Sequence, residues 1–279
     1  MILIGNGQIA LGDCLDVMRS VQSASVDMIL CDLPYGTTQN KWDSVIPFEP
    51  LWSEYWRIAK PNAAVVLTAQ CPFDKALGAS QLRYLKYEWI WEKPSATGFL
   101  NAKHQPMKAH ENALVFYREK CVYNPQMITG MKPYKSKQGI KSKNYGAMNE
   151  NNISQSDGER YPRSVVQFNS DRGLHPTQKP VALFEYLIRT YTNPGDTVLD
   201  NCMGSGTTAI AAENTGRRWI GIERDPTYFG LACDRIARHL ADPASDTSIE
   251  HVQRPDGSSS TTWTKRDGST ETVETGCRP

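Results

Sequence analysis

The strongest constraint on the fold of this 279-residue sequence is the alternation of short apolar runs with segments of helical spacing. Runs such as 26–31 and 63–69 are apolar almost throughout, which is typical of buried strands in a parallel sheet. Between such runs, apolar residues recur every three or four positions, as on one face of a helix. Strands that alternate with helices predict a doubly wound, mostly parallel α/β sheet. The expected strands are 8–11, 26–31, 63–69, 86–92, 112–117, 196–199 and 219–222, and the expected helices are 14–21, 47–59, 72–80, 184–191, 209–214 and 226–240.

A strand, a glycine-bearing loop and a helix between residues 196 and 214 predict a nucleotide site. Gly204, Gly206 and Ala209 match the loose dinucleotide pattern G-x-G-x-x-A, in which glycines let the backbone approach a ligand at a helix N-terminus. Glu223 ends the next strand, where an acidic side chain can accept hydrogen bonds from ribose hydroxyls. A P-loop is excluded because no Gly-Lys-Ser/Thr follows the glycines. A nicotinamide dehydrogenase and an adenosyl-cofactor enzyme both remain open.

A second candidate site follows the apolar run 26–31. Asp32-Leu33-Pro34-Tyr35 stands where that strand leaves the core, and ligands of open α/β sheets bind outside the carboxyl ends of strands. A carboxylate, a rigid proline turn and an aromatic ring suit the task of holding a flat base by its amino group. The alternative is an ordinary Asp-x-Pro turn. A methyltransferase needs a substrate site beside an adenosine site, whereas a dinucleotide fold needs a second mononucleotide half, and only one helix and a polar tail follow Glu223.

The segment 121–149 is basic, because it contains five lysines and no acidic residue. Tyrosines are interleaved with these lysines, and the combination suits contacts with phosphates and bases. A solvated basic loop is the alternative. Phosphate contacts position a protein on nucleic acid without reading its sequence. The segment therefore indicates nucleic-acid binding without a defined target. The lysines are Lys132, Lys135, Lys137, Lys141 and Lys143.

Composition excludes several classes of protein. Hydrophobic residues at 39% and charged residues at 22% are typical of a globular protein, and no apolar run approaches the ~20 residues of a membrane span. The first residues lack a basic region and cleavage site, so we expect no signal peptide. Seven scattered cysteines without a Cys-x-x-Cys pair argue against zinc and disulfides and fit a reducing cytoplasm. Residues 242–279 are rich in Ser, Thr, Gly and Asp, which predicts a disordered tail.

With both candidate sites considered, the chain resembles the amino-group DNA methyltransferases, which make N6-methyladenine or N4-methylcytosine. The resemblance runs from about Leu11 to Leu240. Asp32 to Tyr35 resembles the catalytic tetrapeptide Asp/Asn/Ser-Pro-Pro-Tyr/Phe, with leucine in place of the first proline. That proline is thought to act through its backbone carbonyl, which Leu33 also has. The order of the motifs, with the catalytic segment first and the cofactor loop last, is that of the permuted beta group.

The resemblance implies a Rossmann-like methyltransferase fold in circularly permuted order. Residues 1–241 would form the catalytic domain, with 121–165 as an inserted basic target-recognition region. Gly12-Asp13, which resembles the segment near the cofactor adenine, and Glu223 would end neighbouring strands although they lie far apart in sequence. The segment 175–180 would help to enclose the methionine moiety, and the segments 89–94 and 99–110 resemble the strands and loop beside the flipped base.

The resemblance also implies a set of site residues. The catalytic residues are Asp32, Leu33, Pro34 and Tyr35. S-adenosyl-L-methionine is the expected cofactor, and its ligands are Asp13, Thr177, Lys179, Asp200, Gly204, Ser205, Gly206, Thr207 and Glu223. DNA contacts are expected from Lys103, Lys108, Lys132, Lys135, Lys137, Lys141 and Lys143, and no metal is expected. Cys31 and Cys202 lie beside apolar strand ends, where packing is favoured over a nucleophilic role.

The implied reaction transfers a methyl group from S-adenosyl-L-methionine to adenine N6 in double-stranded DNA, after the base has been flipped out. Adenine is favoured because aspartate at the first position of the tetrapeptide goes mostly with adenine in this family. N4-cytosine methylation is the alternative. A dehydrogenase, an RNA- or protein-directed methyltransferase and a catalytically silent DNA-binding protein are further alternatives. The expected partner is DNA. The sequence leaves open the recognition site, a cognate restriction endonuclease, and whether the protein is a monomer or a homodimer.

Overall fold

The computed structural model describes residues 1–37, 43–137, 153–170, 178–242, 248–253, 259–264 and 270–275. The chain divides into two compact units, one comprising Met1–Tyr123 with Ser164–Pro279 and the other Asn124–Arg163. Among the described residues, no helix is both long enough and apolar enough to cross a bilayer. The first unit is therefore built from two separate stretches of the chain.

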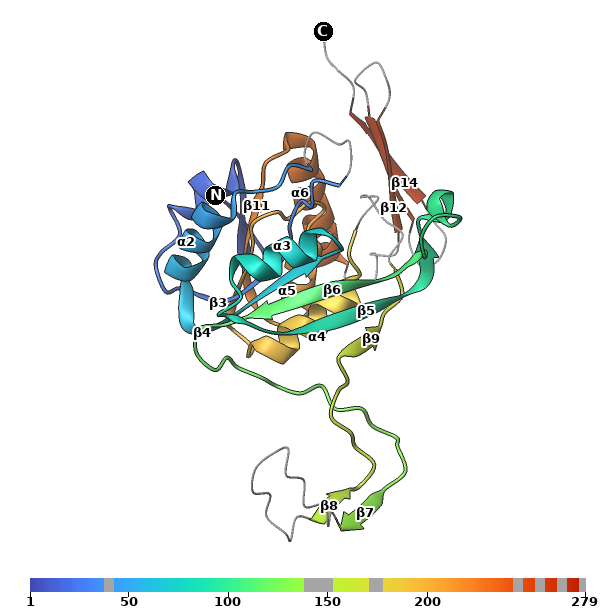
Figure 1. Cartoon of the computed structure of the whole chain (residues 1–279). Helices are drawn as coiled ribbons and strands as arrows, with labels where there is room; N and C mark the ends of the chain where they lie inside the picture. Colours follow the sequence, from blue (N-terminus) through green and yellow to red (C-terminus); the bar gives the residue numbers. More distant parts are fainter. Residues whose placement is uncertain are drawn as a thin grey trace. The chain divides into compact units, whose positions relative to one another are not determined.

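A nine-stranded sheet forms the centre of the first unit, in the order β1-β2-β11-β10-β3-β4-β6-β5-β9 (Figure 1). The five adjacent strands β2, β11, β10, β3 and β4 all run parallel, and β9 is parallel to β5. Strands β1, β5 and β6 make antiparallel pairs. The sheet confirms the predicted mostly parallel α/β fold. The strands are β1 Ile2–Ile4, β2 Gly7–Leu11, β3 Val26–Asp32, β4 Ala59–Ala69, β5 Leu85–Thr97, β6 Lys108–Phe116, β9 Val165–Gln167, β10 Thr197–Asp200 and β11 Arg218–Glu223.

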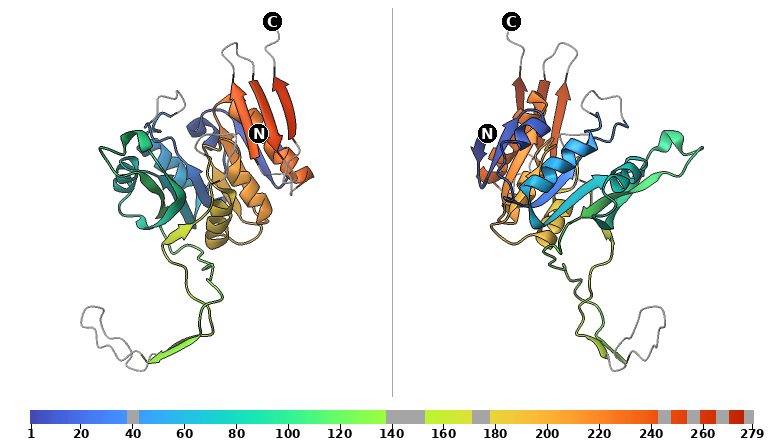
Figure 2. Two further views of the ribbon diagram at one scale, coloured as in Figure 1. Left: turned by 90° about the vertical axis from the view of Figure 1, so that its right-hand side faces the viewer. Right: turned by 60° about the vertical axis from the view of Figure 1, so that its left-hand side comes forward.

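Helices cover both faces of this sheet (Figure 2). Because side chains alternate along a strand, β3 sends Met28 and Leu30 into one hydrophobic cluster and Ile29 and Cys31 into the other. The first cluster contains residues of α4, α5 and α6, and the second contains residues of α1, α2 and α3. Each central strand is therefore buried on both sides, which explains its continuous apolar sequence. The helices are α1 Cys14–Met18, α2 Phe48–Ile58, α3 Phe73–Ser80, α4 Val181–Tyr191, α5 Thr207–Asn214 and α6 Pro226–Ala241.

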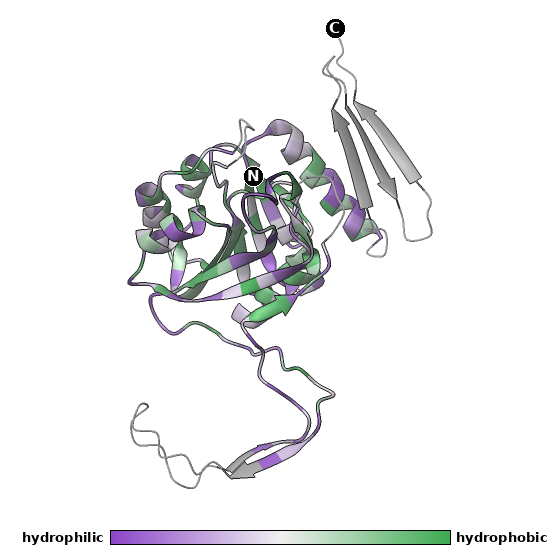
Figure 3. Ribbon diagram, turned by 45° about the vertical axis from the view of Figure 1, so that its right-hand side comes forward, coloured by the Kyte–Doolittle hydropathy of each residue, from purple (hydrophilic) through white to green (hydrophobic). Residues whose placement is uncertain are grey.

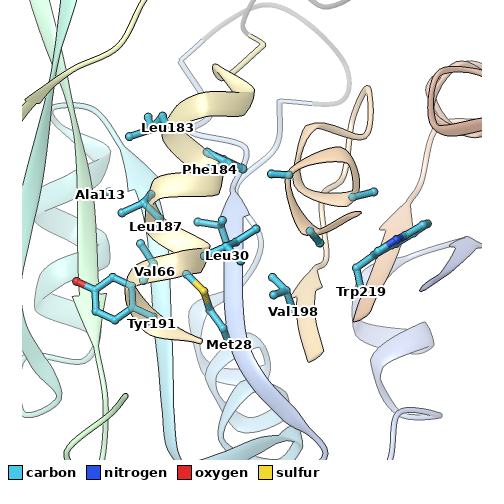
Figure 4. Packing of buried hydrophobic residues seen from close by; sticks show 14 of the residues in the cluster. Met28, Leu30, Val66, Ala113, Leu183, Phe184, Leu187, Tyr191, Val198 and Trp219 are labelled. Carbon is cyan, nitrogen blue, oxygen red and sulfur yellow. The ribbon is translucent and has the colours of Figure 1, made fainter. Parts of the chain in front are cut away.

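Helix α4 packs its apolar face onto the middle of the sheet. Leu187 and Tyr191 lie close to Met28 and Val66, and all four are at most 1% exposed (Figure 4). The spacing of the buried helical residues is the four-residue interval expected for one face of a helix. The indole of Trp89 on β5 also donates a 2.6 Å hydrogen bond to the Tyr191 hydroxyl, so the buried polar atoms are paired. Figure 3 shows hydrophobic residues along the strands and the packed helices of this unit.

The second unit lies within the residues 121–165 that were predicted as an insertion. Strands β7 (Tyr134–Lys137) and β8 (Ile153–Ser156) pair antiparallel, with Tyr134 opposite Ser156. An isolated bridge joins Ile128 to Arg160, and the Arg160 guanidinium lies 4.4 Å from the centre of the Tyr134 ring. The unit is therefore a small hairpin with its own local contacts.

The structure differs from the sequence-based expectation at several elements. Strands β1 and β9 were not predicted, and α1 ends at Met18 rather than at residue 21. Residues 242–279 were predicted to be disordered, whereas three antiparallel strands are described there: β12 Ser248–Gln253, β13 Ser259–Thr264 and β14 Thr270–Thr275. Their sequences are rich in Thr, Val and other residues of high β-propensity, a signal that an overall polar composition hides.

Two glycines of the first unit test how tightly it is packed. A Cβ atom on Gly7 would lie 2.2 Å from the Trp219 ring, whereas one on Gly230, in the exposed face of α6, would meet nothing within 4 Å. We expect Gly7→Ala to lower the free energy of unfolding by about 1–3 kcal/mol through overpacking. Gly230→Ala should raise it by about 0.5–1 kcal/mol because alanine favours the helix. Urea unfolding measures both, and equal effects of the two variants would contradict this packing.

Candidate functional site

The candidate site lies at the carboxyl edge of the central strands. Strand β3 ends at Asp32, and its parallel neighbour β10 ends at Asp200. From this pair the chain continues to β4 on one side and to β11 on the other, so the edge is a topological switch point of the sheet. Such points open crevices for ligands. A cavity of about 1030 Å³ is found there, lined by residues that include Asp13, Asp32, Asp200 and Glu223.

The Asp32 carboxylate is held by three side chains from different segments. Its Oδ1 accepts hydrogen bonds from the Tyr35 hydroxyl at 2.6 Å and from the Thr68 hydroxyl. Its Oδ2 accepts one from the Lys179 ammonium at 2.6 Å. A carboxylate offers about four lone-pair positions, so these contacts leave about one for a ligand. Because the side chain is 25% exposed and lines the cavity, that position is accessible to a ligand in the cavity.

Lys179 connects Asp32 to a second acid, Glu111, which begins the apolar part of β6. The Lys179 ammonium lies 3.2 Å from Glu111 Oε2, and Lys93 of β5 contacts Glu111 Oε1. Lys179, Glu111 and Lys93 are all nearly buried, and with Asp32 the four charges cancel. Burial disfavours the charge of Lys179, but Asp32 and Glu111 outweigh it and raise its pKa. Burial also opposes the ionisation of Glu111, yet Lys179 and Lys93 lower its pKa. Lys179 and Glu111 therefore both remain charged.

The residues after Asp32 form a rigid turn. Leu33 is 4% exposed, and the Tyr35 ring stacks on Phe73 with their centres 5.2 Å apart. The next two backbone amides, of Gly36 and Thr37, donate to the buried Asp43 carboxylate at 2.7 and 2.9 Å. Burial and the neighbouring Asp32 carboxylate raise the pKa of Tyr35, so its hydroxyl stays protonated and donates to Asp32.

The Asp200 carboxylate forms hydrogen bonds with the glycine-bearing loop that follows it and with the start of α5. The Asp200 carboxylate accepts hydrogen bonds from the backbone amide of Cys202 at 3.0 Å and from the hydroxyl of Thr208. Burial raises the pKa of Asp200 to about 6, although these hydrogen bonds oppose the shift. Gly204 and Gly206 adopt left-handed φ angles of +54° and +87°, which favour glycine. A Cβ on Gly204 would meet nothing within 4 Å, so the loop presents open backbone to the cavity.

Glu223 joins this loop to the neighbouring strand β2. Its carboxylate accepts hydrogen bonds from the amides of Gly204 and Asp225, both at 2.8 Å, and burial raises its pKa. Its carbonyl accepts a 2.9 Å hydrogen bond from the amide of Gly12, and Glu223 is in register with Leu11. The adjacency predicted for Gly12-Asp13 and Glu223 is therefore confirmed. Asp13 caps α1 through a 2.9 Å contact with the Leu15 amide and lines the cavity.

The other predicted site residues are distributed between the two units. The cavity is also lined by Pro34, Ser205, Thr207 and Lys108, whereas Lys103 is exposed in the turn after β5. Lys132 and Lys135 are exposed in the second unit, and Lys137 ends β7. Thr177, Lys141 and Lys143 lie outside the described residues.

Sequence reasoning missed Thr68, which contacts Asp32, and Glu111, which contacts Lys179. Thr68 is a hydroxyl residue inside the apolar run 63–69, and Glu111 is an acid that directly precedes the predicted strand 112–117. Polar residues in or beside buried strands are the available signal, because such groups need a partner when buried. Lys179, predicted as a cofactor ligand, contacts the carboxylates of Asp32 and Glu111.

Cysteines near the cavity have the environment of packing residues. Cys31 is fully buried, and burial raises its pKa to about 12. A hydrogen bond with Cys14 lowers the pKa of the Cys202 thiol, but the contact with Cys31 and burial outweigh it, so this pKa is also raised well above its usual value. Both thiols are therefore protonated at neutral pH, and a thiol is a poor nucleophile. Within the described part of the chain, no three His, Cys, Asp or Glu residues are grouped as metal ligands.

Comparisons of the sequence and of the structure with known proteins all find DNA methylases or methyltransferases. Residues 26–234 match a family described as DNA methylase. A curated relative, the type II methyltransferase M1.MboII of Moraxella bovis, is 29% identical over 79% of this chain and 92% of its own length. The crystal structure of the M1.HpyAVI–SAM complex aligns with a TM-score of 0.57 at 26% identity, over 82% of this chain and 99% of that one. The PvuII cytosine-N4-specific DNA methyltransferase has a similar fold, with a TM-score of 0.58 at 16% identity over 84% and 92% of the two chains.

The buried charge network predicts a strong effect of removing Lys179. In Lys179→Met, Asp32 loses an ion-pair partner and Glu111 keeps only Lys93, so we expect the free energy of unfolding to fall by about 3 kcal/mol. Arg19→Met is the matched control, since it breaks an ion pair with Asp16 in which both side chains are at least 70% exposed. The control should change stability by less than ~1 kcal/mol. Urea unfolding distinguishes the two, and a Lys179→Met effect as small as the control would contradict a buried network.

The raised pKa of Asp200 predicts a pH dependence of stability. Because its folded-state pKa of about 6 exceeds the ordinary value of 3.8, the folded state binds more protons between these values. Stability relative to Asp200→Asn should therefore fall by about 3 kcal/mol as pH rises from about 4 to 7. Thermal unfolding of the wild-type protein and of Asp200→Asn across this range measures the difference. A constant difference between wild type and Asp200→Asn would refute the shift.

Proposed function

Because this chain belongs to the DNA methylase family, we propose that it transfers the methyl group of S-adenosyl-L-methionine to the N6 atom of adenine at a specific sequence in double-stranded DNA. The observation that carries the proposal is the meeting of two segments in one cavity. The Asp32 tetrapeptide ends β3, and the Asp200 loop follows the neighbouring strand β10. A methyl-transfer enzyme needs this juxtaposition of a substrate amine and an adenosyl cofactor, because orientation of the reactants supplies much of the rate acceleration.

The residues around the glycine loop fit S-adenosyl-L-methionine. The loop leaves open space beside Gly204, and the partly buried carboxylate of Glu223 ends β11, a position from which an acid can accept hydrogen bonds from ribose hydroxyls. Asp13 and Asp200 add negative charge to the same cavity wall, which suits a cationic cofactor. We assign cofactor binding to these residues together with Ser205, Gly206, Thr207, Lys179 and Thr177. When bound, the cofactor supplies an electrophilic methyl group on a positively charged sulfur.

Asp32 and Leu33 orient the target amine in the proposed reaction. The remaining lone-pair position on Asp32 and the backbone carbonyl of Leu33 accept hydrogen bonds from the two amino hydrogens. These bonds direct the nitrogen lone pair away from the ring, toward the methyl group. As the nitrogen formed its bond to the methyl carbon, the bond from that carbon to sulfur would break, with its electron pair left on sulfur. The nearby carboxylate would stabilise the positive charge gained by the nitrogen, which would then lose one proton to solvent. The hydrogen bonds from Tyr35, Thr68 and Lys179 hold the carboxylate in place, so no reorganisation is needed during the step.

Access to the amine requires the base to leave the duplex. An amino group that is stacked and paired cannot reach a cavity in the enzyme, and flipping costs a few kcal/mol. Tyr35, fixed by Pro34 and by stacking on Phe73, would stack on the flipped base and offset part of this cost. The choice of adenine over cytosine rests on the aspartate at position 32, since both bases present an exocyclic amine.

The lysines are proposed to contact the DNA backbone. Lys103 and Lys108 lie in or beside the turn that follows β5, and Lys132, Lys135 and Lys137 belong to the second unit. We extend the assignment to Lys141 and Lys143, which lie outside the described residues. We assign target recognition to this second unit. The M1.MboII relative is named a type II methyltransferase, which favours a cognate restriction endonuclease as a functional partner. Sedimentation would distinguish a monomer from a homodimer.

Methyl transfer from tritium-labelled S-adenosyl-L-methionine to unmethylated duplex DNA tests the proposal. Wild-type protein should place the label in N6-methyladenine, as found by nucleoside analysis. Asp32→Ala should lower transfer by at least about a hundredfold, because the amine loses its acceptor and its charge stabilisation. Calorimetry should show that the variant still binds the cofactor, and the exposed Asp16→Ala control should retain full activity.

The other outcomes correct the proposal in different ways. Label in N4-methylcytosine would support the same mechanism but show that the target base is cytosine rather than adenine. Wild-type protein that binds the cofactor but transfers no label to DNA would overturn the substrate. Full activity in Asp32→Ala would remove Asp32 from the reaction.

A further inference from the structure

The turn between β5 and β6 carries two large apolar side chains that are exposed. Gly98, with a left-handed φ of +89°, precedes the short 3-10 helix η1 (Phe99–Asn101) at the tip of this hairpin. Phe99 is 77% exposed and Leu100 is 95% exposed. Neither side chain belongs to a hydrophobic cluster of the described residues. Figures 1 and 2 show the hairpin extending beyond the sheet to this tip.

The tip stands at the rim of the candidate active site. Residues Thr97, Gly98, Asn101, Gln105 and Lys108, on both sides of Phe99 and Leu100, line the cavity that contains Asp32. Strand β5 leads from this cavity to the tip through Trp91, Lys93 and Ser95, which also line it. Exposed apolar side chains are therefore placed next to the position where a target base would enter.

The basic residues around the tip are complementary to the negative charge of DNA. Between Gly98 and His110 the chain contains Lys103, His104, Lys108 and His110 and no acidic residue, and the four basic side chains are exposed. Lysines attract phosphates, whereas the apolar pair would gain nothing from a phosphate backbone. A surface that combines basic residues with an exposed apolar pair suits a ligand that has negative charge on its outside and flat apolar groups inside. Duplex DNA has this character, with its bases stacked beneath the phosphates.

From this arrangement we infer that Phe99 and Leu100 insert into the DNA base stack beside the target base and hold the gap open after flipping. The inference rests on the proposed function and adds the residues that stabilise the opened duplex. Apolar wedges such as Phe and Leu enter base steps in proteins that deform DNA. Removal of one base leaves its neighbours without a stacking partner on one side, and an inserted ring replaces part of that contact. Phe99 and Leu100 are exposed in the free protein because, in this proposal, DNA covers them only in the complex.

The test compares paired and pre-opened targets. The double variant Phe99→Ala/Leu100→Ala is assayed for kcat/KM of methyl transfer on a duplex with the mapped target, and on the same duplex with an abasic site opposite the target base. Opening is already easier in the second substrate, because a base without a partner costs less to flip. Leu3→Ala is the matched control, since Leu3 is 81% exposed on β1 and lines no part of the cavity. Phe99→Trp is the conservative variant.

We expect the double variant to lose at least about tenfold in kcat/KM on the paired duplex, in line with the worth of one stacking contact. Its loss on the abasic duplex should be about threefold or less, since opening is no longer limiting. Phe99→Trp should stay close to wild type, and Leu3→Ala should match wild type on both substrates. Fluorescence of 2-aminopurine at the target position should show less flipped base for the double variant.

Several results would overturn the inference. Equal losses on the two duplexes would show a general binding contact rather than a wedge. Unchanged activity of the double variant, with or without altered self-association in sedimentation, would show that the pair does not act on DNA. Failure of the wild-type protein to methylate any DNA is a separate result, which would overturn the proposed function and this inference with it.

Discussion

The parallel pairing of β3 with β10 is the constraint on which the site depends. The two strands are far apart in sequence, and their register places the ends at Asp32 and Asp200 on the same edge of the sheet. A side-chain contact supports the pairing, since Asp27 Oδ2 accepts a 3.0 Å hydrogen bond from the Thr197 amide at the opposite end of β10. Because every central strand from β2 to β4 runs in the same direction, all of their carboxyl ends contribute to one crevice. The motifs meet whatever their order along the chain.

Burying charged side chains in this crevice is energetically unfavourable, and the structure compensates for it differently at different residues. Asp32 and Glu111 pair with Lys179 and Lys93. In the described part of the chain Asp200 and Glu223 are instead held by hydrogen bonds, and both show raised pKa values. Buried charges without a counter-ion are unfavourable. Ionisation is therefore less favourable around Asp200 and Glu223 than around Glu111. A cationic ligand beside Asp200 and Glu223 would favour their ionisation, so the free protein is already complementary to it.

The sequence predicted what depends on local pattern and failed where distant residues meet. The apolar run before Asp32 and the glycine loop were accessible because buried strands and their loops leave local signals. The neighbouring positions of Gly12 and Glu223 were predicted from the family resemblance. The ion pairs of Lys179 could not be read in the same way. Lys179 is separated from Asp32 by 147 residues, and no spacing rule links them. The strands β12 to β14 were missed for a different reason, since overall polarity concealed local β-propensity.

The order of the strands also has a consequence for the growing chain during synthesis. Strands β2 and β3 are consecutive in sequence, yet β11 and β10 lie between them in the sheet. A ribosome that has released only the first half of the protein has therefore made two strands whose facing edges have no partner. Such edges promote pairing with other chains, and a sheet closed by late, non-local contacts forms slowly. The nascent protein must keep this gap protected until residues 197–223 emerge, and only then can both halves of the crevice exist together.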